Sequence, residues 1–181
     1  MRDNNGDQER PMSLSPAALL ALICPALLLA AAVRDATSYT IPNAIPLALA
    51  LLFPVAALAN GVALGGLAAH VGVGAAALCV GLALFALRAI GGGDAKLFAA
   101  TALWIGWPIA PFVMFTVLAG GGLAALLLAF RVEAFRSLMN SGPAWVARLA
   151  RPGQGAPYGV AIAVGALMVL PQTPFGLSLG V

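Results

Sequence analysis

Asp35 and Asp94 are the residues of this chain whose type and position best suit chemistry. Beyond the polar residues 1–13 the chain carries three acids, and the third, Glu133, lies among arginines. Asp35 and Asp94 each lie at the junction between an apolar stretch and a polar one. Two carboxylates held close together cannot both ionise at low cost, so such a pair shares one proton. The ionised member can then activate water while the protonated member polarises a carbonyl group, which hydrolyses an amide without a metal or a covalent intermediate.

The glycine run before Asp94 favours this interpretation. Residues 91–94 read GGGD, and three glycines carry a high cost in backbone entropy. Such a run is expected where the backbone turns sharply or approaches another segment closely, so it can hold Asp94 against a second carboxylate or an extended peptide. The alternative is that Asp35 forms an ion pair with Arg34, and Asp94 forms one with Lys96 or Arg88.

Other reactive groups are few and poorly placed. Cys24 and Cys79 lie inside apolar stretches without a CxxC partner, and the single histidine, His70, lies in the middle of another. A zinc site is therefore not expected, and no cofactor is predicted. The serines lack a histidine at a suitable depth for nucleophilic catalysis.

The composition predicts a membrane protein that positions these acids on helices. Hydrophobic residues make up 62% of the chain and charged residues 8%, against about half and a quarter in soluble domains. The nine basic residues are scattered between apolar blocks, which excludes a phosphate-tracking stripe and hence nucleic-acid binding.

We predict an all-α bundle of about six transmembrane helices, because a span needs about 20 mainly apolar residues. The fourth and sixth segments are shorter than that, which indicates tilted or re-entrant geometry. The first is expected to be retained, since its apolar run is too long for a signal peptide and an acidic tail precedes it. The six segments are residues 14–33, 42–59, 62–87, 96–106, 109–130 and 157–171. They form one domain, 14–171, between a polar tail at 1–13 and a short tail at 172–181.

The basic residues predict the orientation. Seven lie in the loops after the first, third and fifth segments, and two lie in the N-terminal tail. By the positive-inside rule the three loops are cytoplasmic and both termini lie outside. The largest loop, 131–156, is basic and amphipathic and suits contact with anionic lipid. Two complete spans separate Asp35 from Asp94, so both are expected at the cytoplasmic side.

Three segments resemble a known family. Asp35 precedes Ile41-Pro42-Asn43 by six residues, as in prepilin leader peptidases, and residues 91–97 (GGGDAKL) resemble the GxGD signature of that family. Residues 157–163 (PYGVAIA) are similar to the start of the last helix in its short branch, which serves Flp-type tight-adherence pili.

The resemblance implies an aspartic endopeptidase of the bacterial inner membrane with Asp35 and Asp94 as the catalytic pair. The matching motif positions are expected to support them: Gly91, Gly93, Lys96, Pro42 and Asn43. The implied partners are a type IV prepilin or pseudopilin substrate, membrane lipid and pilus or secretion assembly proteins. Larger members add a domain with paired CxxC motifs and N-methylate the product; this chain lacks those cysteines, so methyl transfer is not expected. Residues 36–40 depart from the family, which often has arginines there.

Two supporting residues admit more than one role. Lys96 either orients Asp94, contacts the substrate, or extends to the interface as an ordinary snorkelling lysine. Asn43 either contacts the substrate or caps the helix that follows, since Asn is a favoured N-cap residue.

Other functions remain open on sequence grounds. Acids beside glycine-broken helices also suit a small ion- or proton-coupled transporter, although here they fall at span ends rather than near the midplane. A noncatalytic subunit of a secretion machine would not need two acids at equal depth. A GxGD peptidase of another kind would carry a Tyr-Asp motif, and this chain contains no Tyr-Asp dipeptide.

Overall fold

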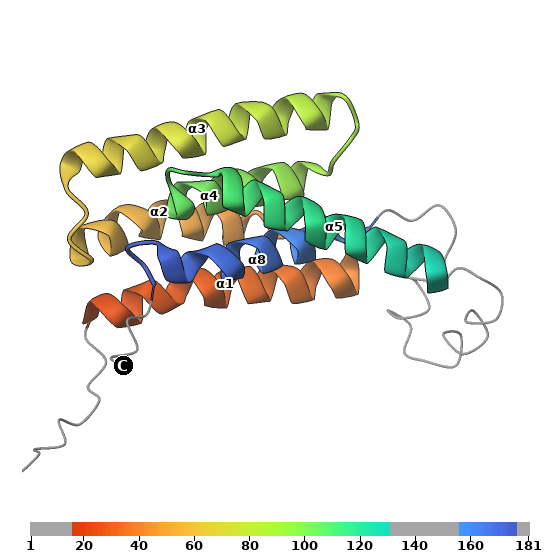
Figure 1. Ribbon diagram of the computed structural model, residues 1–181, viewed down its shortest axis with the longest axis horizontal. Helices are drawn as coiled ribbons and strands as arrows, with labels where there is room; N and C mark the ends of the chain where they lie inside the picture. The colour runs from red at the N-terminus through yellow and green to blue at the C-terminus, as the bar shows by residue number, and fades with distance from the viewer. Residues whose placement is uncertain (1–15, 131–155, 177–181) are drawn as a thin grey trace, which may run out of the picture.

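The computed structural model describes residues 16–130 and 156–176, and this part of the chain is helical throughout, without strands. The long helices run side by side along one direction (Figure 1). Their bounds are α1 Pro16–Ser38, α2 Ala44–Ala59, α3 Leu64–Ala86, α4 Gly92–Ile105, α5 Ala110–Phe130 and α8 Tyr158–Val169, which continues into the 3-10 turn η1 Leu170–Gln172. The fold is therefore the predicted all-α bundle. The predicted tail at 1–13, the basic loop up to residue 155 and residues 177–181 lie outside the described residues.

Within residues 16–130 and 156–176, three helices, α1, α3 and α5, are long and apolar enough to cross a membrane. The other apolar helices, α2 and α8 with its 3-10 turn, are shorter, and α4 has 14 residues. Large apolar side chains on the outside of the bundle remain exposed, for example Leu51 at 66% and Val117 at 66%. An apolar exterior of this kind suits a lipid environment, which confirms the prediction of a helical membrane protein.

Two helix boundaries differ from those predicted, and both differences concern the aspartates. The first helix does not end at residue 33 but continues to Ser38, because the Ser38 hydroxyl donates to the Arg34 carbonyl and prolongs the last turn. The fourth helix begins at Gly92 rather than at residue 96. An apolar run ends at the first charged residue, whereas the backbone hydrogen bonds of the helix continue past that residue. Asp35 and Asp94 thus lie inside helices rather than in loops.

The core of the bundle surrounds α4. This helix packs against α2, α3 and α8, and most of its residues from Ala95 onward are buried. Near its far end Trp104 is fully buried, donates from Nε1 to the Leu49 carbonyl at 2.9 Å, and meets the Phe53 ring edge-on. Because α4 is packed on several sides, its position is fixed, and so is the position of its first turn, where Asp94 lies.

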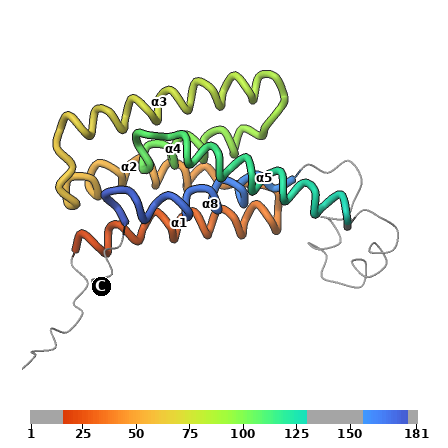
Figure 2. The backbone as a smooth tube through the Cα atoms, viewed as in Figure 1, coloured from red at the N-terminus to blue at the C-terminus, as the bar shows by residue number. Residues whose placement is uncertain are grey.

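One end of the bundle collects the segments that carry the candidate residues. The backbone trace shows the α1–α2 link, the α3–α4 link and the start of α8 at the same end (Figure 2). The α1–α2 link begins at Tyr39, which adopts a left-handed conformation with φ 53° and donates its N–H to the Asp35 carbonyl. This turn ends α1 one turn after Asp35.

Candidate active site

Asp35 lies in the last turns of α1 and faces the start of α8. Its side chain is buried, at 5% exposure, and its Oδ2 atom accepts the backbone N–H of Gly159 at 2.6 Å. Gly159 is the second residue of α8, so its N–H has no carbonyl partner within the helix. The start of a helix also carries partial positive charge. The start of α8 therefore offsets part of the cost of burying a carboxylate at Asp35.

Asp94 lies in the first turn of α4 and is half-buried. Its Oδ2 atom accepts the backbone N–H of Gly91 at 3.1 Å, as the acid of a capping box does, although Gly91 has no side chain to return the bond. Asp94 lies outside the three helices that can cross the membrane. Burial raises the pKa of its carboxyl above the ordinary range, and the Gly91 hydrogen bond acts in the opposite direction.

The structure brings the two carboxylates together at this end of the bundle. They are close enough for a Coulombic interaction between them. The part of the chain that the structure describes contains no ion pair to either aspartate, and the hydrogen bonds described for each come from backbone N–H groups. The alternative in which Asp35 is paired with Arg34, and Asp94 with Lys96 or Arg88, is therefore wrong for these residues.

Ile41, in the α1–α2 link, lies between the two helix starts. A Cβ atom added to Gly93 of α4 would be 3.3 Å from the Ile41 Cβ, and one added to Gly159 of α8 would be 2.9 Å from the Ile41 Cδ1. Both glycines thus permit close approach of a helix start to this link. The Gly93 contact is consistent with a glycine in the GGGD run, since a larger residue would require Ile41 or α4 to shift by a few tenths of an ångström.

Lys96 and Asn43 form a hydrogen bond with each other, a contact that the sequence did not predict for either residue. The Lys96 Nζ donates to the Asn43 Oδ1 at 3.0 Å and joins the start of α4 to the start of α2. Asn43 occupies the N-cap position of α2, but its side chain makes no capping hydrogen bond, so the capping prediction is wrong. Pro42 lies just before it, and the Pro42 carbonyl accepts the Ile45 N–H at 3.0 Å in the first turn.

Gly159 is the residue of this site to which the sequence assigned no role. A Cβ atom there would lie 2.8 Å from the Asp35 Oδ2, so only glycine allows the observed contact. The one signal in the sequence is a glycine in the first turn of an apolar helix, directly after Pro157 and Tyr158. Glycines are frequent in this chain, and that signal does not point to Asp35.

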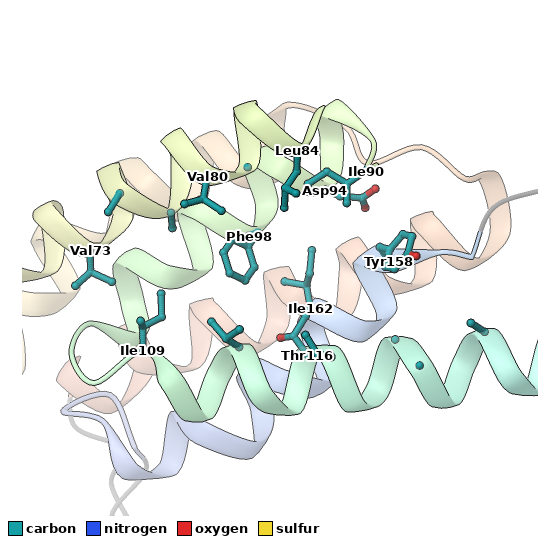
Figure 3. A pocket seen from close by; sticks show the side chains of 18 of the residues that line it. Val73, Val80, Leu84, Ile90, Asp94, Phe98, Ile109, Thr116, Tyr158 and Ile162 are labelled. Atoms are coloured by element: carbon teal, nitrogen blue, oxygen red, sulfur yellow. The ribbon is translucent and has the colours of Figure 1, made fainter. Parts of the chain in front are cut away.

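Asp94 also faces an apolar cavity of about 670 Å³ between α3, α4, α5 and α8. Figure 3 shows Asp94 and Tyr158 at one end of this cavity, with Val73 and Ile109 toward the other. Among the described residues there is no cluster of three or more His, Cys, Asp or Glu side chains that could hold a metal ion. The chemistry available at this site is therefore that of two interacting carboxylates beside an apolar cavity.

Fold and site together define a helical membrane protein with two interacting carboxylates, one buried and one half-buried, at one end of its bundle. A sequence model of the type IV leader peptidase family matches residues 22–129, which is more than half of the chain and includes both aspartates. The chain therefore belongs to the type IV leader peptidase family and is a peptidase whose substrates are prepilins. No curated protein and no solved structure matches it.

Proposed function

We propose that this leader peptidase is an aspartic endopeptidase in which Asp35 and Asp94 form the catalytic pair. The observation that carries the proposal is the placement of both carboxylates at one end of the bundle, within range of a Coulombic interaction and each beside the start of a helix. Gly93 and Lys96 support the pair by holding α4 against Ile41 and Asn43 of the α1–α2 link. Gly91 donates its backbone N–H to Asp94, and the Pro42 carbonyl accepts the Ile45 N–H where α2 begins.

In this mechanism the pair holds one proton. The ionised carboxylate accepts a proton from water, and the resulting hydroxide attacks the carbon of the scissile carbonyl. The protonated carboxyl donates its proton to the carbonyl oxygen, which gives a neutral gem-diol. The C–N bond then breaks as a proton passes to the leaving amine and a diol hydroxyl returns its proton to the pair, so one proton again remains there. No metal, cofactor or covalent intermediate is required.

The substrate is an Flp-type prepilin or a related pseudopilin, cleaved at the cytoplasmic face of the bacterial inner membrane. A basic leader followed by an apolar helix places its junction at the membrane interface, at the depth of Asp35 and Asp94. The seven-to-two distribution of basic residues supports this orientation, with both termini outside. The product passes to pilus or secretion assembly proteins. Methyl transfer is not part of the proposed activity, since the chain lacks paired CxxC motifs.

Isosteric substitutions test the catalytic pair. In cells that express a full-length Flp-type prepilin, Asp35→Asn and Asp94→Asn should each accumulate in the membrane yet lower cleavage by about 100- to 10,000-fold, since each removes a group that transfers protons. The readout is the mobility shift of the prepilin. Glu133→Gln, which changes the one other acid beyond residues 1–13 in the same way, should cleave normally. Normal processing by either aspartate variant would remove that residue from the mechanism.

A further inference from the structure

The apolar cavity beside Asp94 is a groove lined by one face of α3 and one face of α5. On α3 its lining residues follow every third or fourth position from Val73 to Leu84, and on α5 the same spacing runs from Val113 to Ala124. This spacing marks a single face of each helix. Faces of this kind ordinarily pack against a neighbouring helix.

Within the described residues, α4 and α8 line the base of the space between these two faces, and no further helix lies in it. In the described part of the chain α3 packs mainly against α4, and α5 mainly against α8, so the two pairs leave the groove between them. Figure 3 shows α3 and α5 on opposite sides, with Phe98 of α4 and Ile162 of α8 between them. The lining is apolar apart from a few side chains, among them Asp94 and Tyr158 at one end.

The dimensions and side chains of the groove suit a helix. Eleven residue steps, from Val73 to Leu84, correspond to about 16 Å at roughly 1.5 Å per residue, or about three helical turns. Small residues with exposed or partly exposed positions recur on both faces, namely Ala76 on α3 and Gly121 and Ala124 on α5. In a membrane, small residues allow the backbones of two helices to approach closely, which is the main source of helix association there.

We propose that this groove binds the apolar helix of the substrate, alongside α3 and α5, with the end of that helix directed to Asp94. This inference rests on the proposed function. Its basis for choosing a peptide helix over a lipid acyl chain is continuity with the site: the groove ends at a carboxylate, which suits a scissile peptide bond and contributes nothing to the binding of a hydrocarbon tail. The groove then aligns the leader junction with the aspartate pair.

Adjacent glycines of α5 provide a matched pair of variants. Gly121 lines the groove and Gly122 does not, and a Cβ atom added at either position would meet nothing within 4 Å. Gly121→Leu fills the groove, whereas Gly122→Leu adds the same side chain to the same helix outside it. With purified enzyme in liposomes we expect Gly121→Leu to lower kcat/KM for full-length prepilin about tenfold or more, and Gly122→Leu to leave it unchanged.

A short substrate separates loss of binding from loss of folding. A peptide that contains the leader junction but lacks the apolar helix should be cleaved equally by the wild type and Gly121→Leu. If Gly121→Leu impaired both substrates to the same extent, its effect would be structural and the proposal would be overturned. Normal cleavage of full-length prepilin by Gly121→Leu would also overturn it.

Cross-linking distinguishes this proposal from the catalytic one. A photoreactive residue at position 121, in the Asp94→Asn background, should capture the apolar segment of uncleaved prepilin, and one at position 122 should not. Capture of lipid alone, or of a second copy of the enzyme, would refute the groove as the substrate site. If Asp94→Asn still cleaved prepilin while position 121 captured it, the proposed mechanism would fail and the groove proposal would stand.

Discussion

Gly159→Ala tests whether the start of α8 positions Asp35. The added Cβ would lie 2.8 Å from the Asp35 Oδ2, 2.9 Å from the Ile41 Cδ1 and 3.0 Å from the Asp35 Cβ. Contacts of 3.4 Å or more are ordinary, so the carboxylate would have to move by roughly half an ångström or more. The movement breaks or lengthens the 2.6 Å hydrogen bond from the Gly159 N–H.

The size of the effect follows from that hydrogen bond. A hydrogen bond to a charged group contributes about 1.5–3 kcal/mol, and about 1.4 kcal/mol corresponds to a tenfold change in rate. Gly159→Ala should therefore lower kcat by about 10- to 100-fold. The KM for prepilin should change little, because Gly159 acts through Asp35 rather than through substrate contacts. A lower kcat with an unchanged KM is the effect expected from the loss of a residue that positions a catalytic group.

The assay is single-substrate cleavage kinetics with purified enzyme in liposomes. Gly72→Ala serves as the matched control, because Gly72 lies in helix α3 and an added Cβ there meets nothing within 4 Å. That variant should cleave at the wild-type rate. Size-exclusion chromatography of each variant checks that the fold is intact. A well-folded Gly159→Ala enzyme with wild-type kcat would refute the role assigned to the start of α8.

Two further predictions concern the remaining groups of the site. Because burial raises the pKa of Asp94, its carboxyl keeps a proton to higher pH than an ordinary aspartate, and kcat/KM should fall as the pH rises through the apparent pKa of the pair and the shared proton is lost. A cleavage rate that kept rising through the alkaline range would contradict a shared proton. Lys96→Met should lower the cleavage rate by less than about tenfold. Adding Asn43→Ala to that variant should lower the rate no further, since both substitutions remove the same hydrogen bond. Independent, additive losses in this double-mutant cycle would show that the two residues act separately.

Much of the arrangement was determined by the sequence alone. Each of the six apolar stretches corresponds to a helix in the described part of the chain, because burial in lipid requires apolar side chains over a set length. Two of these stretches separate Asp35 from Asp94, so simple alternation predicts both at one side of the bundle, where the structure has them. The motifs around the two aspartates also indicated the family that the comparison shows.

The contacts that shape the site were decided only by the tertiary structure. Gly159 lies 124 residues from Asp35 in the chain, and nothing in its local sequence indicates which side chain its N–H will meet. Asn43 occupies the N-cap position of α2, yet its side-chain oxygen accepts a hydrogen bond from Lys96, 53 residues away, and does not cap the helix. The faces of α3 and α5 each show a regular spacing, but their separation depends on how α4 and α8 pack between them. Hydrophobicity and backbone hydrogen bonding are local properties that a sequence records directly, whereas distances between helices follow from the packing of all their side chains together.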